Sequence, residues 1–162
     1  MRTASDYIEM KVPAKPDYVG VVRLTISGLA NRMGFAFDEI EDIKIAVSEA
    51  VTNVVNHAYT DTDEDKGQVR IGCNIYDDRM EITVVDQGKS FDVESISKNL
   101  GPVDGKSVDQ LHEGGLGLFL IDTLMDKVEI SSEAGVVVMM TKYLHRDEVE
   151  EHVDRISPAP SQ

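Results

Sequence analysis

The segment DEIEDIKIAVSEAVTNVVNHAY, residues 38–59, carries the clearest helical pattern in the chain. Asp38, with Glu41 three residues later and Phe37 before it, predicts a capped helix start with a hydrophobic staple. Apolar residues then recur every three or four positions, as on one buried helix face, at Ile40, Ile43, Val47, Ala50, Val51, Val54 and Ala58. We therefore predict a long helix that begins at Asp38 and packs one face against a core.

Three polar residues lie on another face of the same helix. Glu49, Asn53 and His57 are spaced four apart, so their side chains stack along the helix. A carboxylate, an amide and an imidazole in this arrangement suit a site that holds a hydrated metal and activates a nucleophile. An ordinary solvated face is the alternative, because every amphipathic helix has a polar side.

Length and composition limit the possible classes. A chain of 162 residues predicts one domain with a sizeable core. The net charge of −14 argues against direct nucleic-acid binding, and fits either a basic protein partner or general solubility. The one cysteine, Cys73, excludes an internal disulfide and lies in an alternating apolar run, which predicts a core thiol. No signal peptide or membrane-spanning run is present, so we expect a soluble cytoplasmic protein.

The remaining patterns predict an α+β fold. Pro16 and Gly34 mark the ends of a first helix. Consecutive hairpins predict a mixed, mostly antiparallel sheet, covered on one face by three helices in a two-layer α/β sandwich. Residues 1–145 form the domain, and residues 146–162 form a charged tail with a disordered end. The expected elements are strands 7–12, 68–76, 79–86, 128–131 and 136–143, helices 16–33, 38–59 and 114–125, and a long loop or lid over 89–113.

A second polar motif, Asp86-Gln87-Gly88, ends a predicted strand. The Asp86 carboxylate could accept a hydrogen bond from an exocyclic amine such as that of adenine, and Gly88 would let the ring approach the backbone. Asp-x-Gly is also a common turn, so the motif alone is weak.

A third motif, Gly114-Gly115-Leu116-Gly117-Leu118, opens the last predicted helix. Backbone N–H groups without side chains can reach phosphate oxygens at a helix N-terminus, where the helix dipole favours negative charge. The spacing is neither that of a Walker A loop nor that of a Rossmann fingerprint. A glycine-rich helix start without a ligand is the alternative.

The order of the three motifs, with a lid before the third, resembles the N, G1 and G2 boxes of the GHKL ATPase superfamily. The resemblance implies the Bergerat fold with ATP and Mg²⁺ as cofactors. It implies Glu49 as general base and Asn53 as magnesium ligand, roles that suit their chemistry. Adenine would be held by Asp86 and Gly88. The phosphates would be bound by Gly114, Gly115, Leu116 and Gly117.

Sequence outside the boxes is similar to anti-sigma factors of the serine-kinase type, for example over residues 6–14 and 21–31. This resemblance implies a homodimer that binds sigma-B and phosphorylates a serine of a STAS-type anti-anti-sigma protein, without contacting nucleic acid or membrane. His112 and Val137 depart from the family pattern, and His57 receives no role. These departures keep a second hypothesis open, a nucleotide-binding module that sequesters sigma without catalysis. The third is a detached histidine-kinase catalytic domain.

Overall fold

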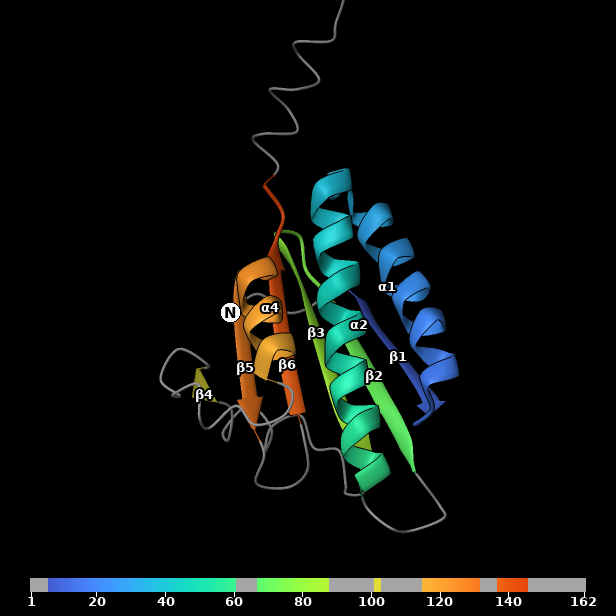
Figure 1. Cartoon of the computed structure of the whole chain (residues 1–162). Helices are drawn as coiled ribbons and strands as arrows, with labels where there is room; N and C mark the ends of the chain where they lie inside the picture. The colour runs from blue at the N-terminus through green and yellow to red at the C-terminus, as the bar shows by residue number, and fades with distance from the viewer. Residues whose placement is uncertain (1–5, 61–66, 88–100, 103–114, 132–136, 146–162) are drawn as a thin grey trace, which may run out of the picture.

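The sheet and its helices are described by a computed structural model over residues 6–60, 67–87, 101–102, 115–131 and 137–145 (Figure 1). The elements are β1 (Asp6–Pro13), the 3₁₀ turn η1 (Pro16–Tyr18), α1 (Val19–Met33), α2 (Phe37–Thr60), β2 (Gln68–Ile75), β3 (Arg79–Gln87), β4 (Gly101–Pro102), α4 (Gly115–Leu124), β5 (Lys127–Ser131) and β6 (Val137–Tyr143). The tail and most of the predicted lid lie outside the described residues.

The strands form one sheet in the order β1-β2-β3-β6-β5-β4. Helices α1, α2 and α4 cover one face of it, which confirms the two-layer α+β prediction (Figure 1). The expectation of a mixed sheet is wrong for the described strands, because all five pairings are antiparallel. Helices α1 and α2 are antiparallel, so the chain returns to the end of the sheet where β1 finishes, and β2 begins there.

The predicted edge strand and hairpin are confirmed. β1 lies at one edge of the sheet, and the Tyr76 N–H donates to the Arg79 carbonyl oxygen across the turn between β2 and β3 (3.0 Å). Within the region predicted as a lid, Gly101 and Pro102 form the short strand β4 at the opposite edge.

The helix starts differ from the predictions. Pro16 begins η1, and α1 starts only at Val19. The expected cap at Asp38 and staple at Phe37 are also wrong. The Ile40 N–H donates to the Ala36 carbonyl oxygen at 3.0 Å, so α2 already begins at Phe37, and the Phe37 side chain is 75% exposed. Asp38 thus lies inside the first turn, where its negative charge interacts favourably with the positive end of the helix dipole.

Gly34 ends α1 as predicted. Its φ of 96° is left-handed, a conformation that glycine adopts without steric cost, and its N–H donates to the Asn31 carbonyl oxygen. The chain can therefore reverse within three residues and start α2 antiparallel to α1.

The core lies between the sheet and the three helices. All the apolar positions of α2 that the pattern predicted are buried or half-buried among the described side chains, and Ile43, Val47, Ala50 and Val54 have no exposed surface. Cys73 is buried here as predicted, and burial raises the pKa of its thiol to about 12. No helix in the described part of the chain is both long and apolar enough to cross a membrane.

Candidate functional site

The first and third sequence motifs meet where α2 packs against α4. A side-chain carbon built on Gly117 would lie 2.9 Å from Glu49 Oε2 and 3.2 Å from Asn53 Nδ2. Any larger residue at this position would therefore displace these side chains. The fold brings together Glu49, Asn53 and Gly117 from the first and third sequence motifs, and their roles stay predictions.

Packing of the apolar face of α2 fixes these two polar side chains. Ala50, Val51 and Val54 point into the core, so Glu49 and Asn53 emerge half-buried along the adjacent face. Gly117 lies in the first turn of α4 and is buried against them. Backbone N–H groups in this first turn have no partner within the helix and can bind an anion.

Asn53 carries a polar atom that the described structure does not satisfy. Its Nδ2 is buried and has no hydrogen-bond partner among the described residues. An unsatisfied buried donor destabilises a protein by about 1–3 kcal/mol. Rotating the amide by a half-turn about the Cβ–Cγ bond would exchange the nitrogen and oxygen positions. A half-buried amide that lacks a partner is suited to receive a ligand.

The donor chemistry around Asn53 fits a magnesium ion that is held together with a nucleotide. Among the described residues, no group of three His, Cys, Asp or Glu side chains could enclose a metal ion. Mg²⁺ needs no such cage, because it keeps several waters and binds one or two protein oxygens plus substrate phosphates. Asn53 could supply such an oxygen beside the start of α4.

Glu49 also borders a hollow on the side of α2 that faces α1. This hollow has a volume of about 440 Å³ and is lined by Arg23, Glu41, Lys44, Ile45, Ser48 and Glu49. The Lys44 Nζ atom is paired with Glu41 Oε1 at 3.0 Å, while the Glu49 carboxylate has no hydrogen bond or ion pair within the described part of the chain. No sequence pattern predicted this hollow, because it joins residues from two helices that share no linear motif.

The second motif reaches the same end of the molecule. Asp86 is half-buried near the end of β3, opposite Val69 of β2. Figure 1 places the end of β3, the second half of α2 and the start of α4 toward one end of the sheet. The roles of Asp86 and of the phosphate-binding residues stay predictions.

The other predicted residues are described only in part. Gly115 and Leu116 are the first two residues of α4. Gly88, Gly114 and His112 lie outside the described residues, as does the His57 side chain, although the His57 backbone belongs to α2.

Comparisons with known proteins identify the family of the chain. Residues 12–142 match the family of histidine kinase-like ATPase domains. The serine-protein kinase RsbW of Halalkalibacterium halodurans is 60% identical over 93% of this chain and 91% of its own length. The serine-protein kinase RsbW of Bacillus subtilis is 55% identical over 93% of both chains.

A solved structure shares the fold. The RsbU and RsbW domains of Rv1364c from Mycobacterium tuberculosis superpose with a TM-score of 0.59 at 21% identity, covering 85% of this chain and 32% of that one. At this identity the likeness concerns the fold, whereas the curated relatives align over nearly their whole length. The chain therefore belongs to the RsbW family of serine-protein kinases, within the histidine kinase-like ATPase domains.

Proposed function

We propose that this protein transfers the γ-phosphoryl group of ATP to a serine of a STAS-type anti-anti-sigma protein, and that it sequesters a sigma-B-type sigma factor. The single observation that supports the chemistry best is the contact of Gly117 with Glu49 and Asn53. It joins a candidate base, a candidate metal ligand and a helix N-terminus at one point. The relatives named serine-protein kinase RsbW support the choice of serine as acceptor.

Glu49 would act as the general base. In the transfer step, the serine oxygen forms a bond to the γ-phosphorus, the bond from that phosphorus to the bridging oxygen of ADP breaks, and Glu49 takes the hydroxyl proton. A carboxylate without an ion pair in the described structure is available for this proton. The hollow of about 440 Å³ beside Glu49 gives a polypeptide segment access to this carboxylate from the α1 side.

The nucleotide would lie across the end of the sheet. Asp86 and Gly88 would hold adenine. Backbone N–H groups from Gly114 to Gly117 would bind the phosphates at the N-terminus of α4. The side-chain oxygen of Asn53 would hold Mg²⁺. When bound, the ion neutralises phosphate charge in the transition state.

The partner assignments rest on family membership. A chain with net charge −14 is suited to a partner with a basic surface, although charge alone does not identify that partner. We propose that phosphorylation releases the STAS-type protein and leaves the kinase free to hold sigma-B, and that the working unit is a homodimer. ATP and Mg²⁺ are the cofactors of this cycle.

A transfer assay tests the proposal. The purified protein is incubated with ATP, Mg²⁺ and the candidate STAS-type protein, and the products are analysed by mass spectrometry. We expect one phosphate on a serine of the partner and none in the presence of a chelator. Retention of sigma by the protein without any phosphoserine would instead support the sequestering module. Phosphohistidine on a partner would support the detached histidine-kinase domain.

A further inference from the structure

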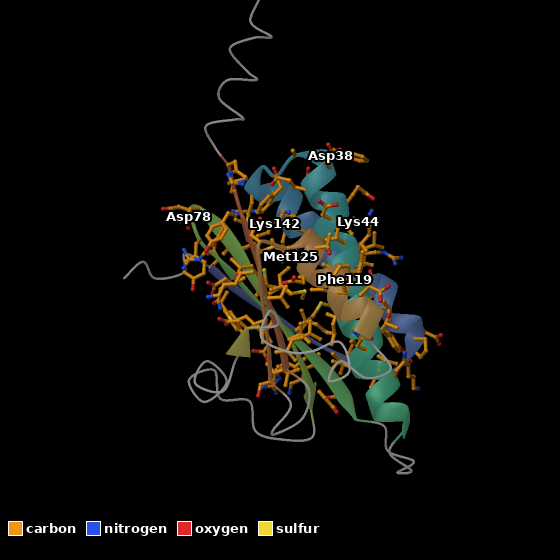
Figure 2. All side chains as sticks on the ribbon, turned by 60° about the vertical axis from the view of Figure 1, so that its left-hand side comes forward. Asp38, Lys44, Asp78, Phe119, Met125 and Lys142 are labelled. Carbon is orange, nitrogen blue, oxygen red and sulfur yellow. The ribbon has the colours of Figure 1, made fainter. Side chains whose placement is uncertain are left out.

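Lys142 interrupts the apolar pattern on the inner face of β6. Alternation along the strand places Lys142 on the same face as Val138 and Met140, which are fully buried. Lys142 is half-buried, and a cation that is partly removed from water is stabilised by an acceptor. Its Nζ atom donates to the Leu124 carbonyl oxygen at 2.8 Å. Figure 2 labels Lys142 together with Met125, the residue that follows α4.

That carbonyl belongs to the last residue of α4, where helical carbonyl groups have no partner within the helix. A cation there also interacts favourably with the negative end of the helix dipole. Asp126 adds two hydrogen bonds to the same strand. Its N–H donates to the Thr141 carbonyl oxygen at 3.0 Å, and its Oδ2 accepts the Tyr143 N–H at 2.7 Å. One hydrogen bond thus holds the last residue of α4 to β6, and two more hold the connection between α4 and β5 to the same strand.

The two ends of α4 differ in how they are held. Its last residue is bonded to the sheet by the Lys142 side chain, whereas its first turn contacts Glu49 and Asn53 through a glycine. A ten-residue helix is about 15 Å long, so a tilt at one end moves the other. The orientation of the first turn therefore depends on the anchor at the last turn.

We propose that Lys142 is a positioning residue that orients the phosphate-binding end of α4 for ATP. This role rests on the proposed function, because it requires that phosphate binds at residues 114–117. Lys142 acts through the helix and does not touch the nucleotide. Removing it should weaken ATP binding more than it lowers the transfer rate at saturating ATP, because Glu49 itself is held by α2 and not by α4.

The test compares Lys142→Met with Lys142→Arg in the full chain with Mg²⁺ present. Isothermal titration calorimetry gives the ATP Kd, and steady-state kinetics give kcat and the KM for ATP. We expect Lys142→Met to raise Kd and KM by about three- to tenfold, in line with the worth of a cation at a helix C-terminus. Lys142→Arg should restore both values to within about twofold. Should Lys142→Met fail to fold, Lys142→Gln tests the same contact, with the same weakening expected.

A control variant separates the proposed positioning role of Lys142 from a general loss of folding stability. Val22→Ala removes buried apolar atoms from α1, far from α4 along the sheet, and should leave the ATP Kd unchanged at a temperature where every variant is folded. Equal weakening in Val22→Ala and Lys142→Met, or a wild-type Kd in Lys142→Met, would overturn the role of Lys142. Absence of ATP binding in the wild type would instead refute the proposed function, and with it the basis for this role.

Discussion

Helix α2 packs against two neighbours in different ways. Toward α1 the buried part of the contact is apolar, and Val22, Ile26 and Ala30 of α1 are almost completely buried in the shared core. The polar residues that line the hollow beside Glu49 lie outside this core. Toward α4 the contact includes the Glu49 carboxylate, a glycine and the Asn53 amide, whose nitrogen has no partner among the described residues. Apolar burial stabilises a fold, whereas an unsatisfied buried amide destabilises it. The difference indicates that the buried α1 contact maintains the fold and that the α4 contact is shaped by ligand binding.

The largest expected effect is the loss of phosphoryl transfer in Glu49→Gln. The amide keeps the shape of the carboxylate but cannot accept the serine proton, so we expect kcat to fall by about 10²- to 10⁴-fold. Phosphoserine formation at saturating ATP measures this loss. Because Glu49 has no ion pair in the described structure, the free energy of unfolding should change by less than about 0.5 kcal/mol. Transfer at the wild-type rate would exclude Glu49 as the base.

On the α1 side, Ile26→Ala should have the opposite effect, with a large loss of stability and unchanged activity. Ile26 is 1% exposed, and its truncation should lower the free energy of unfolding by about 2–5 kcal/mol. Urea unfolding followed by circular dichroism measures this change. At a temperature where the variant stays folded, kcat and the KM for ATP should match the wild type. A large change in kcat without loss of stability would mean that the α1 contact also serves catalysis.

Local sequence patterns predicted the helices and strands better than the contacts between them. The apolar period of α2, the glycine at the end of α1 and the alternation in β2 each depend on neighbouring residues, and the structure confirms them. The capping prediction at Asp38 failed because several residues in one turn can start a helix, and the short reversal after Gly34 favours the earliest start.

The candidate site was only partly predictable, because contacts between elements that are distant in sequence do not follow from local patterns. Residue types and motif order identified Glu49, Asn53 and Gly117, but only the packing of α4 on α2 brings them into contact. The hollow beside Glu49 and the Lys142 anchor depend on pairs of elements that are distant in sequence. A lysine in the core-facing register of a strand was a usable signal that the sequence analysis did not exploit.

The closeness of the α4 contact is tested by Gly117→Ala. The added carbon would lie 2.9 Å from Glu49 Oε2, so the carboxylate or the helix must shift. A displacement of about 1 Å at a reacting group can reduce the rate by about 100-fold, and we expect a loss of up to that size in kcat/KM for ATP. Steady-state kinetics with the STAS-type protein as acceptor provide this value.

Gly28→Ala is the matched control on the exposed part of α1. A carbon added at Gly28 would have no neighbour within 4 Å, so activity should be unchanged. Both substitutions gain helix propensity, by up to about 1 kcal/mol in a helix interior. If Gly117→Ala were as active as Gly28→Ala, the α4 contact would be looser than the distance implies. The α4 side of α2 would then differ less from the α1 side in its importance for activity.

The stability change in Asn53→Leu is small, and its sign is the informative quantity. Asn53→Leu replaces the unpartnered amide with an apolar group of similar size, which should raise the free energy of unfolding by about 1 kcal/mol in the absence of nucleotide. The same change removes the proposed magnesium ligand, so phosphoryl transfer should be lost while the protein becomes more stable. Urea unfolding without ATP measures the stability, because bound ligand would stabilise the wild type alone.

Asn56→Leu, at an exposed position one turn further along α2, serves as control and should change stability by less than about 0.5 kcal/mol. A gain in stability confined to Asn53→Leu means that the native residue is maintained against folding stability, as expected for a binding group and not for a packing residue. If Asn53→Leu were instead destabilised and still active, the amide would belong to the structural contacts of α2, and the α4 side would resemble the α1 side.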